Sequence, residues 1–143
     1  MTISRTAVLI AIGFLVLSVG YSPAQQEQTV NDEDIAVSSF EEIPYPALAH
    51  AARREGIVVV EAKLDDGGYV VSAKAISGSK MLTSDTLSNV RKWRFRPNPK
   101  KAAVVIYEFH LVEGRCGAGN NALFVLREPN VATITTCEMQ PQP

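Results

Sequence analysis

The strongest constraint on the fold is a chain-reversal signal between two stretches of alternating apolar residues. Residues 57–64 are rich in β-branched side chains, and every second position is apolar: Val58, Val60, Ala62 and Leu64. Asp65-Asp66-Gly67-Gly68 follows, and glycine tolerates the positive φ angles of tight hairpins. Residues 69–76 then return as a second strand. The pattern predicts a β-hairpin with one apolar face.

A short helix is predicted immediately before this hairpin. Pro46 suits the first helical position, because its missing N–H costs nothing there. Residues 47–55 are good helix formers, and Gly56 is expected to end the helix in the left-handed conformation. Leu48 and Ala52 are four residues apart, so we expect both to face the core.

A second helix is predicted over residues 82–93, with Thr83 or Ser84 as its N-terminal cap. Its apolar face consists of residues at helical spacing: Leu82, Thr86, Val90 and Trp93. Pro97 prevents the helix from continuing. Trp93 is the only tryptophan, and beside Phe95 at a helix end it is expected in the core rather than in a binding site.

Three further strands complete the prediction. One long strand covers residues 102–112, and two shorter ones cover residues 122–127 and 131–137. The element order predicts an α+β domain over residues 44–112, in which two short helices pack on one face of a small antiparallel sheet. Residues 113–143 form an added β-rich tail.

The two cysteines of the chain, Cys116 and Cys137, both fall in this tail. In an exported protein an even pair of cysteines is most simply a disulfide. A bridge that closes a loop of about 20 residues adds roughly 3 kcal/mol of stability. The alternative is two unrelated buried thiols.

The N-terminus has the features of a cleavable signal peptide over residues 1–24. Arg5 precedes an uncharged run at residues 7–19, and Ser22-Pro23-Ala24 places small residues before a cut after Ala24. The competing interpretation is a membrane anchor, although a full span needs about 20 apolar residues. Residues 25–43 are polar and acidic and are expected to form a flexible leader. The sequence thus predicts an exported, periplasmic protein, with inner-membrane attachment as the alternative.

Composition excludes several classes of function. The formal charge is −1 at pH 7, so the chain has no basic excess for nucleic acid. His50 is expected at a helix end and His110 on the solvent side of a strand, and neither stands in a metal-ligand or catalytic pattern. We therefore expect no enzymatic activity, no metal, no cofactor and no small-molecule substrate.

A cluster of basic residues follows the second predicted helix: Arg91, Lys92, Arg94, Arg96, Lys100 and Lys101. Such a cluster attracts an acidic partner or an anionic surface. The alternative is charge at a helix end followed by a solvated loop.

The order of these motifs resembles the C-terminal domain of TonB energy transducers. Tyr45-Pro46 opens the matching region, and Asp66-Gly67 and Ser77-Gly78 follow at the family's spacing. The most specific element is Val90-Arg91-Lys92-Trp93-Arg94-Phe95-Arg96-Pro97, which holds the family's Trp-x-Phe-x-Pro pattern. The resemblance covers about residues 43–111 and not the tail.

This resemblance implies a periplasmic domain that contacts outer-membrane transporters by pairing one strand with an extended segment of its partner. The candidate pairing edge is the strand after the Trp-x-Phe-x-Pro pattern, with the residues Val104, Val105, Ile106, Tyr107, Glu108, Phe109 and His110. The alternative is that the added tail covers this strand, because an exposed apolar edge promotes aggregation.

The chain departs from a full transducer in its short hydrophobic run and in a leader without proline-rich sequence. Fully extended, that leader spans about 65 Å at ~3.5 Å per residue. Three functions follow as hypotheses. The first is a periplasmic module that binds an envelope protein, such as a TonB-dependent outer-membrane transporter. The second is a membrane-anchored energy transducer, and the third is a structural domain that forms a homodimer.

Overall fold

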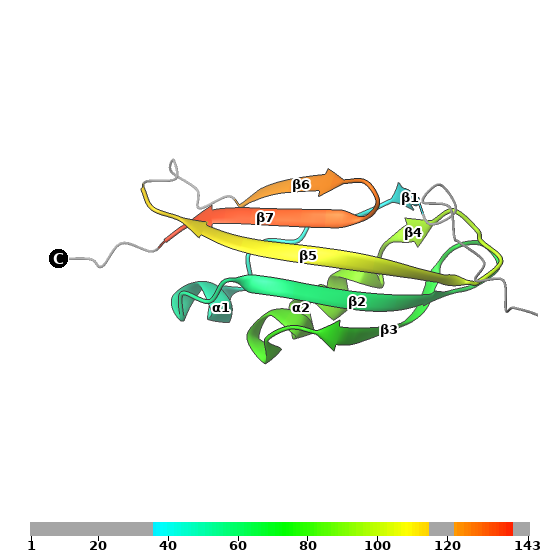
Figure 1. Cartoon of the computed structure of the whole chain (residues 1–143), viewed down its shortest axis with the longest axis horizontal. Helices are drawn as coiled ribbons and strands as arrows, with labels where there is room; N and C mark the ends of the chain where they lie inside the picture. The colour runs from blue at the N-terminus through cyan, green and yellow to red at the C-terminus, as the bar shows by residue number, and fades with distance from the viewer. Residues whose placement is uncertain (1–35, 115–121, 139–143) are drawn as a thin grey trace, which may run out of the picture.

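The computed structural model describes residues 36–114 and 122–138. The elements in chain order (Figure 1) are β1 (Val37–Ser39), α1 (Ala47–Ala51), β2 (Gly56–Leu64), β3 (Val70–Ser77), α2 (Lys80–Val90), β4 (Arg94–Phe95), β5 (Ala102–Val112), β6 (Leu123–Arg127) and β7 (Val131–Cys137). The predicted strands and both predicted helices are present, and the α+β class is confirmed.

Five strands form one sheet in the order β3-β2-β5-β7-β6, and β1 pairs separately with β4. β3, β2 and β5 of the predicted domain pair antiparallel as expected, but the added tail makes the complete sheet mixed. β5 and β7 run parallel, whereas the other neighbours are antiparallel. The cause is the order of the last strands: β6 lies outside β7, so two chain reversals bring β7 back beside β5 in the same direction (Figure 1).

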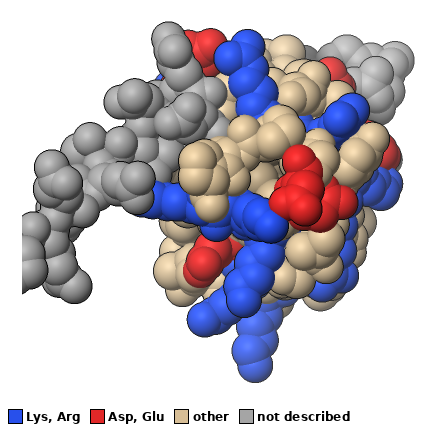
Figure 2. All heavy atoms as spheres, turned by 90° about the vertical axis from the view of Figure 1, so that its right-hand side faces the viewer, with Lys and Arg blue, Asp and Glu red and all other residues tan. Residues whose placement is uncertain are grey.

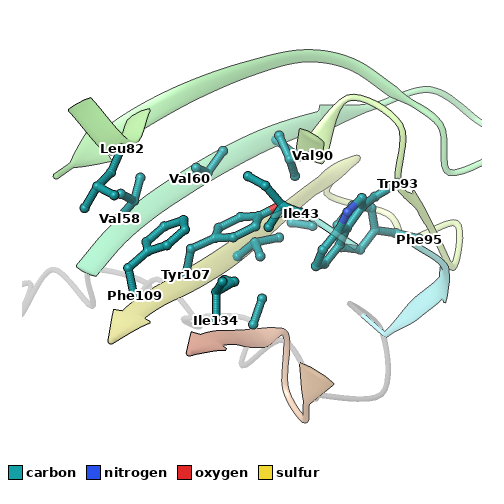
Figure 3. Close-up of a cluster of buried hydrophobic side chains, with 14 of the residues drawn as sticks. Ile43, Val58, Val60, Leu82, Val90, Trp93, Phe95, Tyr107, Phe109 and Ile134 are labelled. Atoms are coloured by element: carbon teal, nitrogen blue, oxygen red, sulfur yellow. The ribbon is translucent and has the colours of Figure 1, made fainter. Parts of the chain in front are cut away.

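The core lies between the helices and one face of this sheet. Alternate residues of β2 are buried as predicted, and they meet the predicted face of α2. Figure 3 shows how these side chains converge with the aromatic rings of β4 and β5: Val58, Val60, Leu82, Val90, Trp93, Phe95, Tyr107 and Phe109. Trp93 is 1% exposed, which confirms its place in the core. Ile134 of β7 belongs to the same cluster, so the tail contributes to the core.

The hairpin turn forms as the sequence predicts. The side-chain oxygen of Asp65 accepts hydrogen bonds from the amides of Gly67 and Tyr69, both at 2.9 Å. Gly68 has a φ of +82°, and a Cβ atom there would lie 1.9 Å from the carbonyl oxygen of Phe95. Only glycine fits this turn.

The ends and the phase of the helices differ from the prediction. α1 ends at Ala51, and Arg53 takes the left-handed φ of +50° that was expected of Gly56. Leu48 is 66% exposed and Ala49 is buried instead, so the helix turns a different face to the core than the one predicted. The cap of α2 is Ser79, whose hydroxyl accepts a hydrogen bond from the amide of Met81 at 3.4 Å.

The folded region begins before the predicted boundary at residue 44. β1 pairs with β4, and Ile43 is 4% exposed within the core. Residues 36–43 were predicted as part of a flexible leader and belong to the fold instead, because Ile43 lies in the core, Val37 packs against it, and Phe40 contacts Trp93 and Phe124. Residues 1–35, which include the predicted signal peptide, lie outside the described residues. Within the described ranges, neither helix has the length and continuous apolar character that a membrane span requires.

The predicted Cys116–Cys137 bridge remains a prediction. Cys137 ends β7, whereas Cys116 lies outside the described residues.

The burial of Ile134 predicts that the tail is integral to the fold. Replacing Ile134, which is fully buried, with alanine should lower the free energy of unfolding by about 2–5 kcal/mol. The measurement is urea denaturation. Leu123→Ala is the matched control on the neighbouring strand, because Leu123 is 65% exposed and its loss should cost less than about 0.5 kcal/mol. Equal effects of the two substitutions would show that β7 does not contribute to the core.

Candidate strand-pairing edge

The strand predicted as the free edge lies inside the sheet. β5 pairs with β2 over residues 102–109 and with β7 over residues 106–112. At its start, the carbonyl oxygen of Val104 accepts a hydrogen bond from the side-chain amide of Asn130 at 3.3 Å. The expectation that residues 104–110 form a free edge is therefore wrong, and the alternative, coverage by the tail, is the observed arrangement. Val105, Tyr107 and Phe109 of β5 are fully buried on the helix side of the sheet.

On the face away from the helices, β5 is tied to β6 and β7 by side chains. The guanidinium of Arg127 donates to the carboxylate of Glu108 at 2.7 Å and to the hydroxyl of Thr133 at 3.1 Å. Thr133 also donates to Glu108 at 3.0 Å. Glu108, one of the predicted binding residues, is thus engaged within the molecule. His110 is exposed, as predicted.

His50 connects the first helix to the tail. Its Nε2 lies 2.6 Å from the carbonyl oxygen of Cys137. Close by, the carboxylate of Glu55 accepts a hydrogen bond from the amide of Leu111 at 2.6 Å. His50 was expected at a helix end and does lie in the last turn of α1, but its partner is in β7. In the described part of the chain, no group of three His, Cys, Asp or Glu side chains is placed to hold a metal ion.

Among the described residues, the five-stranded sheet ends at β3 on one side and at β6 on the other. The β3 edge is irregular. Its pairing with β2 shifts register twice, between Val59 and Val60 and between Lys63 and Leu64. Such bulges twist an edge and make it a poor template for another strand.

The β6 edge is regular. Five consecutive residues of β6 pair with β7 without a register shift. Its outer row of amide and carbonyl groups has no neighbouring strand in the described structure. Side chains on its two faces differ: Leu123 and Val125 are 65% and 41% exposed, whereas Phe124 and Leu126 are half-buried on the helix side. This edge is the better candidate for pairing with a further strand.

An aromatic pair extends along the helix side of β6. The rings of Phe40 and Phe124 stack with centroids 5.5 Å apart and an interplanar angle of 20°. Phe40 also contacts Trp93 at 5.8 Å, yet 46% of Phe40 remains exposed. The stacked pair therefore presents apolar surface beside the last strand of the sheet. We call the Phe40–Phe124 pair the aromatic shelf.

Asn89 positions the segment that carries the shelf. Its side-chain amide donates to the carbonyl oxygen of Glu41 at 2.9 Å. Its side-chain oxygen accepts from the indole of Trp93 at 3.0 Å and from the hydroxyl of Tyr107 at 2.8 Å. Burial raises the pKa of Tyr107, so its hydroxyl stays protonated and remains a donor. Lys92 adds an ion pair to the carboxylate of Glu41 at 2.7 Å.

A pocket of about 550 Å³ opens at the end of β6. Its lining is half apolar and half polar, and the lining residues are Ala36, Val37, Arg96, Leu126, Arg127, Glu128, Pro129 and Asn130. Leu126 lines the pocket and lies two residues after Phe124 on the same face of β6. The shelf and the pocket thus follow one another along the same strand.

The basic cluster does not form a patch of one sign. Figure 2 shows Lys and Arg side chains at this end of the molecule with acidic groups between them. Lys101 pairs with Asp66 at 2.6 Å, and Lys92 pairs with Glu41. The guanidinium of Arg94 in β4 lies 4.5 Å from the ring centre of Tyr69 in the hairpin, a cation–π contact. The structure favours the interpretation of solvated charge for most of this cluster.

A family model for the C-terminal domain of Gram-negative bacterial TonB proteins matches residues 41–111. The solution NMR structure of the Pseudomonas aeruginosa TonB C-terminal domain is similar, with 24% sequence identity and a TM-score of 0.44. That match covers 55% of this chain and 88% of the Pseudomonas chain. Among curated proteins, no sequence matches this chain. The family match ends within β5, so β6 and β7 lie outside it.

The sequence predicted β6 as a strand but did not identify it as the edge of the sheet. The available signal was the apolar character of residues 122–127 on both faces. The lateral order of β6 and β7 depends on which strand pairs with β5, and local sequence does not specify that choice.

Hydrogen exchange should distinguish the two strands. Residues 106–109 of β5 lie between two paired strands, so all their amides should be protected. In β6, alternate amides face outward and should exchange orders of magnitude faster than their neighbours. The measurement is native-state exchange by NMR. Fast exchange at alternate positions of residues 106–109 would instead identify β5 as the open edge.

Asn89→Ala should destabilise the protein by about 1–3 kcal/mol, because it leaves the buried hydroxyl of Tyr107 without its acceptor. Urea denaturation measures this loss. Ser88→Ala is the control from the same helix, since Ser88 is exposed and bonds only within α2. If Asn89→Ala lowers the free energy of unfolding no more than Ser88→Ala does, the role assigned to the Asn89 side chain is contradicted.

Proposed function

Because residues 41–111 belong to the family of C-terminal domains of Gram-negative bacterial TonB proteins, we propose that this chain is a protein-binding module of the cell envelope that engages its partner by strand addition at β6. The single observation that carries the proposal is the regular edge of β6, which has no neighbouring strand on its outer side in residues 36–114 and 122–138. The partner is an envelope protein with an accessible extended segment, such as a TonB-dependent outer-membrane transporter. The location is the periplasm, after removal of the predicted signal peptide.

Strand addition derives its affinity from main-chain hydrogen bonds and its selectivity from side-chain pockets. β6 offers both, since among the described residues its outer backbone groups have no neighbouring strand, and the aromatic shelf and a pocket lie beside it. β5 offers neither, because β7 occupies its second edge. Binding thus takes place on the part of the chain that lies outside the family match.

The role of an interaction module is also consistent with the surface of the described residues. Leu123 and Val125 are exposed on one face of β6, and Phe40 is exposed on the opposite, helix face beside Phe124. Exposed apolar groups that lie together mark interaction sites more often than scattered ones do.

The test is an NMR titration of the protein purified from the periplasm of an expression host. Peptides from the periplasm-facing segments of outer-membrane transporters serve as probes. We expect chemical shift changes at residues 123–127 and slowed exchange of their outward amides. A peptide N-methylated at one amide that faces β6 should bind about 10-fold more weakly, because it loses one main-chain hydrogen bond.

Two outcomes would contradict the proposal. Shift changes confined to β3 would place the binding edge on the other side of the sheet. Equal binding of the N-methylated and unmodified peptides would show that main-chain pairing is not involved. Light scattering of the free protein is the control for self-pairing, and a monomer is expected.

A further inference from the structure

The two faces of β6 set different requirements on an incoming strand. On the helix side, Phe124 is followed two residues later by Leu126, which lines the pocket. We propose that the site selects an extended segment with large apolar side chains at two alternate positions, one on the aromatic shelf and the next in the pocket. This inference rests on the proposed strand addition at β6 and specifies the chemistry of the partner.

The first contact is made by the aromatic shelf. A strand beside β6 places every second side chain on the helix side, directly next to Phe124 or Leu126. The residue next to Phe124 lies beside Phe40, which is 46% exposed and stacked at 5.5 Å. A large apolar side chain there covers surface of Phe40 that water otherwise contacts, and an aromatic ring extends the stack.

The second contact is made by the pocket. The next side chain on the same face, two residues along the partner, lies beside Leu126. The pocket of about 550 Å³ accommodates one large side chain, and Val37, Leu126 and Pro129 give it apolar walls. Arg96, Arg127 and Glu128 also line the pocket. Because Arg127 is ion-paired with Glu108, the remaining charges, on Arg96 and Glu128, are opposite and favour neither an acidic nor a basic side chain.

The size of the edge favours a short segment over a second copy of this chain. β6 has five residues, which at about 3.4 Å per residue gives an edge about 17 Å long. A stable protein dimer buries about 800 Å² on each partner, more than one pair of five-residue strands supplies. A segment of about seven residues matches the edge, the shelf and the pocket together.

The experiment compares designed seven-residue peptides by NMR titration of the protein from the periplasm. The first peptide carries phenylalanine at position 3 and leucine at position 5 in a threonine background. The second has the same composition with the apolar residues at positions 3 and 4, so that they point to opposite faces. We expect the first peptide to bind about 10-fold more tightly. Serine at position 3 or 5 should remove this advantage, whereas serine at position 4 should leave it unchanged.

In the protein, the substitution Phe40→Ala should abolish the preference for the first peptide, whose apolar residues stand at positions 3 and 5. Val71→Ala, at a residue of β3 that is 63% exposed, is the matched control and should leave the preference unchanged. The peptide substitutions keep the inference testable if Phe40→Ala weakens the fold. Equal affinity of both peptides at β6 would overturn the inferred selectivity and leave strand addition intact. Shift changes from neither peptide at β6 would overturn strand addition and the inference with it.

Discussion

The parallel pairing of β7 with β5 is the interaction on which the arrangement of this molecule depends. It spans seven residue pairs, from Ile106 with Val131 to Val112 with Cys137. It also places Ala132 and Ile134 in the core, where both are fully buried. With β7 in this position, the sheet cannot extend from β5, and the free edge moves outward to β6.

The chain therefore combines a region that matches the family model with an integrated extension. The matched region ends at residue 111, within β5, and the hairpin of β6 and β7 completes the sheet beyond it. The extension is tied to the rest by the contact of His50 with the carbonyl of Cys137 and by the network of Arg127, Thr133 and Glu108. An edge that belongs to the extension has no counterpart within the family match. Its shelf combines a residue from before the match, Phe40, with one from after it, Phe124.

Local patterns in the sequence predicted the hairpin, the buried face of β2, the face of α2 and the core position of Trp93. Each of these depends on short-range periodicity or turn chemistry, which a single sequence displays. The position of β5 within the sheet was not predictable in this way, because it depends on the pairing of strands about 25 residues apart. The polar composition of residues 36–43 led to their prediction as a flexible leader, because Glu41 and Glu42 stand beside Ile43, which is buried. Helix propensity also did not specify the face that α1 buries, which contains Ala49 and not Leu48.

The most direct test of the central claim is site-specific photo-crosslinking in the envelope of living cells. A photoreactive amino acid replaces Val125 of β6, Val71 of β3 or Val104 of β5, which are 41%, 63% and 46% exposed. The account predicts a crosslinked adduct with an envelope protein from position 125 and none from positions 71 and 104. Adducts from position 71 or 104 without one from position 125 would contradict the assignment of β6 as the binding edge.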